Sequence, residues 1–246
     1  MSADSKKELY IVGLGPGARQ KMTQEAIDVV EACEVIAGYK VYIDLLKPYY
    51  PDKEYLVNGM RQEVERCRLA LETAAGGKKT ALVCSGDAGV YGMAGITLEL
   101  ATEFPEVDVH VIPGVTAALS GAALLGAPLG HDFTVISLSD LLTPWELIER
   151  RLAAAAEGDF AICLYNPSSH KRHDYLQKAC QILLQKKSGD TMKKGDILLE
   201  FDIDKIKADG YDVTTPIIIS NTEQFAKVKA CEDKVVTKES KLLSVQ

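Results

Sequence analysis

Short apolar runs alternate with longer segments whose apolar residues recur at helical spacing over the first 190 residues or so. The apolar runs have the length of strands and fall at Glu8–Val12, Val35–Ala37, Ala81–Val83, Val107–Ile112, Phe133–Leu138 and Phe160–Tyr165. The segment 62–75 is typical of the intervening helices, since Val64, Cys67, Leu71 and Ala75 share one face. Strands that alternate with helices in this way predict an α/β protein with a parallel or mixed sheet.

Finer features of the pattern give further expectations. The nearly continuous apolar character of 107–112 is typical of a strand covered on both faces of a sheet. Pro48, Pro51 and the tyrosines between them predict a turn-rich connection. Thr23 is placed to cap a helix that runs through Cys33. A further helix is expected from Tyr91 to about Glu103.

Three glycine-bearing turns follow three of these predicted strands. They lie at Gly13–Gly17, within the stretch 80–93 (TALVCSGDAGVYGM), and at Pro113–Gly114. Because the carboxyl ends of parallel strands share one edge of a sheet, we expect the turns to converge on one ligand site. The alternative is that they are plain connecting loops that bind nothing.

The first of these turns departs from the dinucleotide-binding pattern. That pattern is GxGxxG, whereas residues 13–17 read GLGPG. Pro16 has no N–H group to donate and has a fixed φ angle. The turn therefore lets a ligand approach the backbone closely but is a poor site for a pyrophosphate.

Composition narrows the class of protein. A formal net charge of −7 and a pI near 5.2 argue against a nucleic-acid partner, which requires a basic face. No apolar run is long enough to span a membrane, and the first ten residues lack the apolar core of a secretion signal. None of the six cysteines lies in a CxxC pair, so we expect reduced thiols, no metal site and a cytoplasmic location.

With the turns identified, residues 1–191 resemble the tetrapyrrole (precorrin) methyltransferases. The segments VGLGPG, SGDAGVYGM and IPGVTA are similar to that family's three S-adenosylmethionine-lining segments, in the same order. The stretches GAPLGHDFTVISLSDLLTPWE and LYNPSSHKRHDYLQKACQILL resemble one branch, the precorrin-3B C(17)-methyltransferases of cobalamin biosynthesis.

The resemblance implies a two-lobed tetrapyrrole methylase fold, with a parallel sheet in the first lobe and a mixed sheet in the second. It implies a homodimer that binds S-adenosylmethionine between the lobes and acts on precorrin-3B or cobalt-precorrin-3. The first lobe is expected over 1–125, the second, on the substrate side, over 126–191, and an atypical tail over 192–246. The implied cofactor-binding residues are Gly13, Gly15, Pro16, Gly17, Ser85, Gly86, Asp87, Ala88, Gly89, Val90, Tyr91, Thr116, Ala117, Tyr165 and Asn166.

The tail breaks the resemblance. From Lys193 onward the sequence resembles the C-terminal end of a β-glucoside-type sugar phosphotransferase IIA domain. All four histidines lie between 110 and 173, so the tail has no histidine that could carry a phosphoryl group. Either the chain is a fusion that lost the family's last strands, or a divergent tail rebuilds them, with Thr214–Asn221 as one such strand.

Several polar residues at strand ends are candidates for chemistry. A methyl sulfonium is already an activated electrophile, so positioning carries most of the rate, and ring contraction needs acid–base assistance at an oxygen. The candidates are Asp87, Ser139, Asp140, Tyr165 and Asn166. Each has a structural alternative: an Asx-turn for Asp87, helix capping for the Ser139–Asp140 pair, and a turn before Pro167 for Tyr165 and Asn166. The basic cluster 170–173 either meets the carboxylate arms of the substrate or is a solvated helix start.

Overall fold

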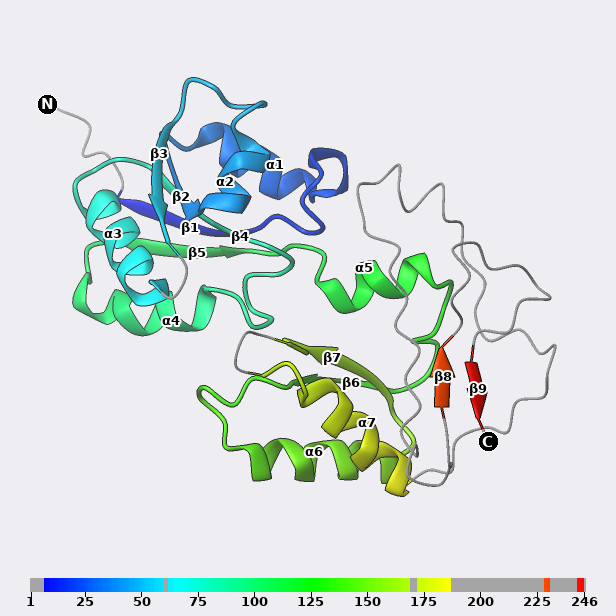
Figure 1. The fold of residues 1–246 in the computed structure, drawn as a ribbon. Helices are drawn as coiled ribbons and strands as arrows, with labels where there is room; N and C mark the ends of the chain where they lie inside the picture. Colours follow the sequence, from blue (N-terminus) through cyan, green and yellow to red (C-terminus); the bar gives the residue numbers. More distant parts are fainter. Residues whose placement is uncertain (1–6, 60–61, 169–171, 187–227, 231–242, 246) are drawn as a thin grey trace, which may run out of the picture. The chain divides into compact units, whose positions relative to one another are not determined.

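The computed structural model describes residues 7–59, 62–168, 172–186, 228–230 and 243–245 (Figure 1). The chain divides into two compact units, Met1–Gly126 and Ala127–Gln246. Within the described residues, no helix is both long and apolar enough to span a membrane.

The first unit is built on a five-stranded sheet in the order β3-β2-β4-β1-β5. Every neighbouring pair in this sheet is parallel, which confirms the parallel sheet predicted for the first lobe. The strands are β1 (Glu8–Gly13), β2 (Val35–Tyr39), β3 (Glu54–Asn58), β4 (Thr80–Cys84) and β5 (Asp108–Ile112). The strands that precede the three glycine turns, β1, β4 and β5, are adjacent, so their carboxyl ends lie side by side.

Helices cover both faces of this sheet (Figure 1). Helices α1 (Gln24–Ala32) and α2 (Lys40–Leu46) pack on one face, and α3 (Glu63–Ala75) and α4 (Ala94–Leu100) pack on the other. The first unit also contains η1 (Arg19–Lys21), η2 (Ala101–Glu103) and α5 (Ala117–Leu124), which follows the turn after β5. Side chains that alternate along β1 enter opposite cores. Val12 packs with α1 and α2 residues, whereas Leu9 and Ile11 pack with α3 and α4 residues. The two-sided burial explains the continuous apolar runs of the central strands.

The cap predicted for α1 is present. The hydroxyl of Thr23 accepts a hydrogen bond from the Ala26 amide at 3.1 Å and donates one to the Pro113 carbonyl at 3.2 Å. The same side chain therefore starts a helix and holds the turn after β5.

The strand expectations in the first unit need one addition and one correction. Strand β3 at residues 54–58 was not expected, because it is an edge strand with little buried apolar surface to signal it, whereas the turns expected around Pro48 and Pro51 are present. Strand β5 is an edge strand as well, so it is not covered like the central strands, and Val111 is 43% exposed.

Two helix expectations also need correction. Val64 was placed on the buried face of α3 but is exposed, and Arg66, Ala70 and Ala74 are buried beside Cys67 and Leu71 instead. Helix α4 begins at Ala94 rather than Tyr91. Tyr91 has a φ of +53°, which excludes it from a right-handed helix.

The second unit contains a parallel pair of strands covered by two helices. The elements are β6 (Phe133–Ser137), α6 (Trp145–Glu157), β7 (Ala161–Tyr165) and α7 (Tyr175–Lys186), with a separate antiparallel pair β8 (Val228–Ala230) and β9 (Leu243–Val245). Its core packs Ile136 and Leu138 against Ile148, Leu152 and Ala179. Among the described residues these strands do not join into one mixed sheet.

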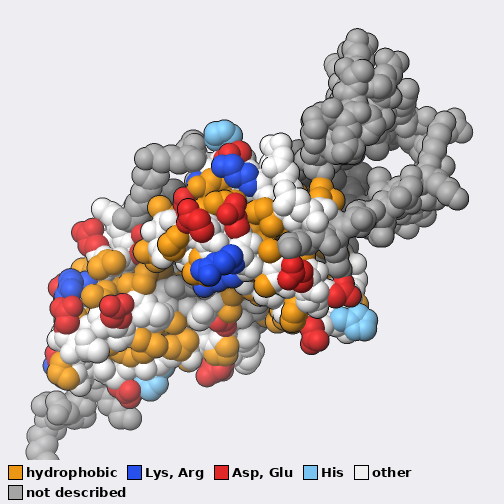
Figure 2. Space-filling view, turned by 90° about the horizontal axis from the view of Figure 1, so that it is seen from below, with side chains coloured by type: hydrophobic (Ala, Val, Ile, Leu, Met, Phe, Trp, Pro, Cys, Tyr) orange, Lys and Arg blue, Asp and Glu red, His pale blue; other side chains and the backbone are white. Residues whose placement is uncertain are grey.

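The remaining composition-based expectations concern cysteines and charge. The described cysteines 33, 67, 84, 163 and 180 are free thiols, as expected, and Cys231 lies outside the described residues. Burial raises the pKa of the Cys84 thiol to about 11, so this group stays protonated at neutral pH. On the face shown in Figure 2, the described basic side chains lie among acidic and hydrophobic ones and form no continuous basic patch.

Candidate active site

The glycine turns after β1 and β4 are joined by backbone hydrogen bonds. Gly15 N–H donates to the Gly86 carbonyl at 3.0 Å, and Gly86 N–H donates to the Gly15 carbonyl at 2.9 Å. Both glycines have positive φ angles, +61° and +65°, which a residue with a Cβ rarely adopts. The residue type is therefore dictated by the backbone bridge between the two turns.

The third turn packs onto the same place. A Cβ added to Gly13 would lie 2.6 Å from the Gly86 carbonyl oxygen and 2.8 Å from the Gly114 nitrogen. A Cβ on Gly114 would overlap the carbonyl oxygens of Gly86 and Gly13. The predicted convergence of the three turns is thus present within the first unit, and Gly13 and Gly114 let the turns touch one another.

Asp87 links two of these turns through its carboxylate. Oδ1 accepts a hydrogen bond from Gly89 N–H at 2.8 Å, and Oδ2 accepts one from Gly114 N–H at 3.0 Å. The first contact is the Asx-turn expected as the structural alternative. The second joins the turn after β4 to the turn after β5 and has no counterpart in the sequence pattern.

The cofactor-binding candidates of the first unit fall into three groups according to how exposed they are to solvent. Gly13, Gly15, Gly86 and Ala88 are buried, and these residues build the joined turns. Pro16, Gly17, Asp87, Val90 and Thr116 are partly buried, and Ser85, Gly89, Tyr91 and Ala117 are exposed. Only the second and third groups offer atoms that a ligand can touch without disturbing the loops.

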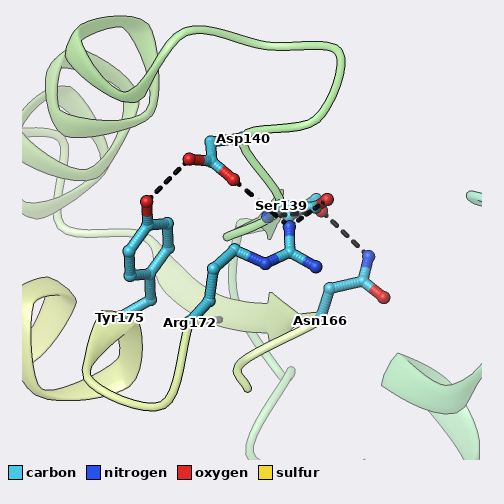
Figure 3. A network of polar contacts seen from close by, with 6 residues as sticks. Ser139, Asp140, Asn166, Arg172 and Tyr175 are labelled. Carbon is cyan, nitrogen blue, oxygen red and sulfur yellow. Dashed lines mark hydrogen bonds and ion pairs between the residues drawn. The ribbon is translucent and has the colours of Figure 1, made fainter. Parts of the chain in front are cut away.

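In the second unit, the candidate residues at the ends of β6 and β7 belong to one polar network (Figure 3). The Ser137 hydroxyl accepts hydrogen bonds from the Asn166 side-chain amide at 2.9 Å and from Ser139 N–H at 3.2 Å. Arg172 donates from Nη1 to the Ser139 hydroxyl at 2.5 Å and lies 3.4 Å from Asp140 Oδ1. The Tyr175 hydroxyl donates to Asp140 Oδ2 at 2.6 Å.

These contacts fix the ionisation of Asp140 and Tyr175. The hydrogen bond from Tyr175, with smaller contributions from a backbone hydrogen bond and from the charge of Arg172, lowers the pKa of Asp140 below its ordinary value. The same hydrogen bond raises the pKa of the Tyr175 hydroxyl. At neutral pH Asp140 is therefore a carboxylate and Tyr175 a neutral donor, which is the pairing that their geometry requires.

Tyr165 and Asn166 have different positions in this network. The Tyr165 carbonyl accepts a hydrogen bond from Leu138 N–H at 2.8 Å, which extends the pairing of β6 with β7 by one step. Asn166 has a φ of +52°, a left-handed conformation that asparagine tolerates better than most residues. This turn directs the Asn166 amide toward Ser137.

The structure brings together Ser139, Asp140 and Asn166 within the second unit, and it holds Asp87 within the first. The sequence interpretation missed Tyr175 and Ser137 and did not anticipate the internal contacts of Arg172. The Arg172 side chain is only 14% exposed and contacts Ser139 and Asp140, so the solvated-cluster reading fails for this residue. Lys171 and His170 lie outside the described residues, and His173 is exposed.

Comparison with known proteins shows that the glycine turns and the polar network lie within the length of chain that one protein family matches, residues 8–193. The family "Tetrapyrrole (Corrin/Porphyrin) Methylases" matches residues 8–193, which include every loop described above. The chain belongs to the tetrapyrrole methylase family. It is thereby an S-adenosylmethionine-dependent methyltransferase of the α/β tetrapyrrole methylase fold.

A second family, the sugar phosphotransferase system EIIA 1 domain, matches residues 179–225. This match agrees with the resemblance stated for the tail. Most of it lies outside the described residues, so both explanations of the tail stay open.

Individual relatives point to one branch of the methylases. The chain is 50% identical over 184 residues to the "Probable cobalt-factor III C(17)-methyltransferase" of Salmonella typhimurium, with 74% of this chain and 76% of that protein covered. It is 45% identical over 179 residues to the "Precorrin-3B C(17)-methyltransferase" of a Sinorhizobium species, with 71% and 70% covered. The crystal structure of the methyltransferase CobJ superposes with a TM-score of 0.68 at 37% identity, with 76% and 77% covered.

Among the described residues, no group of three or more histidine, cysteine, aspartate or glutamate side chains is arranged to hold a metal ion.

Proposed function

We propose that this protein transfers a methyl group from S-adenosylmethionine to C-17 of a precorrin-3-type tetrapyrrole, with ring contraction, in cobalamin biosynthesis. The proposed substrate is a cobalt-containing tetrapyrrole, cobalt-factor III or cobalt-precorrin-3, or the metal-free precorrin-3B; cobalt-factor III and precorrin-3B are the compounds that the names of the Salmonella and Sinorhizobium relatives contain. The observation that carries the proposal is the joining of three glycine turns at neighbouring strand ends in a chain of this family.

The first unit fits the cofactor by the chemistry of its loops. S-adenosylmethionine is a cation with a polar adenosine and a flexible methionine chain, and it has no pyrophosphate that would require a row of N–H donors. The exposed and partly buried loop atoms supply small side chains, hydroxyls and accessible backbone at Ser85, Gly89, Val90 and Thr116. We propose that these residues, with Pro16, Gly17, Tyr91 and Ala117, contact the cofactor, while Gly13, Gly15, Gly86 and Ala88 build the loops beneath it.

Asp87 has a supporting part in this scheme. Its two oxygens accept hydrogen bonds from Gly89 and Gly114, so the carboxylate orders the loops that line the cofactor. When bound, S-adenosylmethionine supplies an activated methyl group. The loops therefore act by holding reactants in position, which contributes a large part of the rate of such transfers.

In the second unit, Ser139 is the proposed group for acid–base assistance at the substrate oxygen. Its hydroxyl oxygen accepts a hydrogen bond from Arg172, and the cationic donor makes the serine proton a better hydrogen-bond donor. Asn166 and Tyr165, at the end of β7, are proposed to orient the substrate or the cofactor. Asp140 stays ionised and holds Tyr175 and Arg172, so its proposed role is to position Ser139.

Labelled methyl transfer tests this function. The protein should incorporate label from S-adenosylmethionine into cobalt-factor III or precorrin-3B, and it should bind S-adenosylhomocysteine in a calorimetric titration. If neither tetrapyrrole is methylated although S-adenosylhomocysteine binds, the alternatives are another precorrin or diphthine-type methyltransferase, or a binding protein without catalysis. The rates with the two substrates also decide whether the natural substrate carries cobalt.

Further properties belong to the same proposal. We infer a homodimer, a cytoplasmic location and no nucleic-acid or membrane partner. The domain roles are those expected from the sequence: cofactor loops in 1–125, the substrate side in 126–191, and an atypical tail, 192–246, that either completes the second unit or is a fused fragment.

A further inference from the structure

The loop between β6 and α6 exposes two adjacent leucines that the fold of the second unit does not use. Leu141 is 78% exposed and Leu142 is 95% exposed, the two highest values among the exposed large hydrophobic residues described. Single exposed leucines are common on protein surfaces, but an adjacent pair on a short loop is a compact apolar tip. We call residues 141–142 the leucine tip.

The loop that carries the leucine tip is held at both ends. On the side of β6, Ser139 and Asp140 are bound by Arg172 and Tyr175 (Figure 3). On the other side, α6 begins at Trp145, whose ring lies 4.5 Å from the Tyr175 ring, centroid to centroid. Tyr175 therefore contacts both ends of the loop, through its hydroxyl and through its ring.

Surface loops usually expose their polar side chains and bury their apolar ones, and this loop does the opposite. Ser139 and Asp140 are held by hydrogen bonds to Arg172 and Tyr175, whereas Leu141 and Leu142 are exposed to solvent. A ligand or partner that covers both leucines on binding would remove their apolar surface from water. The loop follows the carboxyl end of β6 and lies beside that of β7, which is the edge where parallel α/β sheets receive small ligands.

We propose that the leucine tip binds one face of the tetrapyrrole macrocycle and that Tyr175 positions it through Asp140. This inference rests on the proposed function. The macrocycle is a wide, flat ligand whose faces are apolar and whose rim carries carboxylates. Adjacent leucines match a face of this kind, and the polar residues at the strand ends lie next to them to meet its rim.

The first experiment uses the variant Leu141→Gln/Leu142→Gln in the full chain. Trp145 is the only tryptophan of the chain and follows the loop directly, so tetrapyrrole binding is read from the quenching of its fluorescence. We expect at least a tenfold rise in the dissociation constant and in KM for the tetrapyrrole, with unchanged affinity for S-adenosylhomocysteine. Leu98→Gln is the control, because Leu98 is 47% exposed on α4 of the first unit and should leave both affinities unaltered.

A double-mutant cycle tests the positioning role of Tyr175. Tyr175→Phe keeps the ring beside Trp145 and removes the hydroxyl that binds Asp140. It should raise KM for the tetrapyrrole several-fold in the parent and have no further effect in the leucine-tip variant. An equal effect in both backgrounds would show that Tyr175 acts without the tip and would overturn this part of the proposal.

Other outcomes separate the inference from the proposed function. If the parent methylates a tetrapyrrole and the leucine-tip variant binds it equally well, the inference fails and the function stands. If the variant changes the sedimentation mass of the protein instead of its tetrapyrrole affinity, the tip is a contact between copies of this chain and the inference fails. If the parent binds and methylates no tetrapyrrole, both fail together.

Discussion

Replacing Gly13 by alanine should disrupt the joined turns although it adds a single methyl group. The new Cβ would lie 2.6 Å from the Gly86 carbonyl oxygen, and the Gly114 nitrogen and Cα lie 2.8 and 3.0 Å away. All of these atoms are backbone, so no side chain can rotate away to relieve the overlap. Overpacking by one methyl group typically costs ~1–3 kcal/mol. Breaking the two hydrogen bonds between Gly15 and Gly86 would add ~0.5–1.5 kcal/mol for each bond.

The expected loss of stability is therefore about 2–6 kcal/mol, concentrated in the first unit. Tryptophan fluorescence reports the second unit, so the assay is hydrogen exchange at the amides of Gly15 and Gly86. Their exchange should accelerate by at least tenfold, and affinity for S-adenosylhomocysteine should fall. Gly95→Ala is the matched control. Gly95 lies in α4 with no neighbouring atom within 4 Å of an added Cβ, and this change should stabilise the helix by ~0.5–1 kcal/mol. Unchanged exchange and affinity in Gly13→Ala would refute the steric account.

Three further predictions concern Asp87, Tyr175 and the tail. Asp87→Ala should speed hydrogen exchange at the Gly89 and Gly114 amides and weaken S-adenosylhomocysteine binding. The control Asp28→Ala removes an exposed hydrogen bond with Gln24 on α1 and should do neither. Equal protection of the two amides in both variants would count against the link that Asp87 makes between the turns. The hydrogen bond from Tyr175 lowers the folded-state pKa of Asp140, so Tyr175→Phe should destabilise the second unit above about pH 4. The difference in melting temperature between variant and parent, followed by Trp145 fluorescence, should shrink as the pH falls through the folded-state pKa. A difference that stays constant with pH would contradict this. If the tail is a transplanted fragment, amides in 192–246 should exchange faster than those in 80–125, and equally slow exchange would show that the tail is native to the fold.

Much of the fold was accessible from the sequence because the central strands are buried on both faces. Their apolar runs are continuous, and two of them lead into a glycine that the structure requires: Gly13 because the turns touch there, and Gly86 because its φ angle is positive. The edge strand β3 was missed because partial burial leaves only a weak alternation in EYLVN. The start of α4 was placed too early because the sequence does not show that Tyr91 adopts a positive φ.

The candidate site was predicted as a set of positions but not as a set of contacts. Asp87 was recognised by its place in a turn, yet its partner Gly114 is 27 residues away, and no local rule joins the two. Arg172 and Asp140 are 32 residues apart, and Arg172 stands in a basic run that is typical of a solvated surface. Tyr175 carried no signal of its own, since an aromatic residue at the start of an amphipathic helix usually belongs to the core.

Both units use a charged side chain for architecture at the place where ligand chemistry is expected. Asp87 ties two glycine turns together in the first unit, and Asp140 holds Arg172 and Tyr175 in the second. With these carboxylates occupied, exposed or partly buried candidates nearby offer backbone, hydroxyl groups and apolar side chains, as at Gly89, Thr116 and Leu141. Such a surface is poorly suited to create a strong nucleophile, but it suits a reaction whose electrophile is already activated by the sulfonium of the cofactor. Rate in this case comes from holding two bound molecules in one geometry, which requires rigid loops more than reactive side chains. The joined turns and the anchored leucine tip are arrangements of that kind, so substitutions that loosen the loops should reduce methyl transfer as much as substitutions that remove a candidate acid or base.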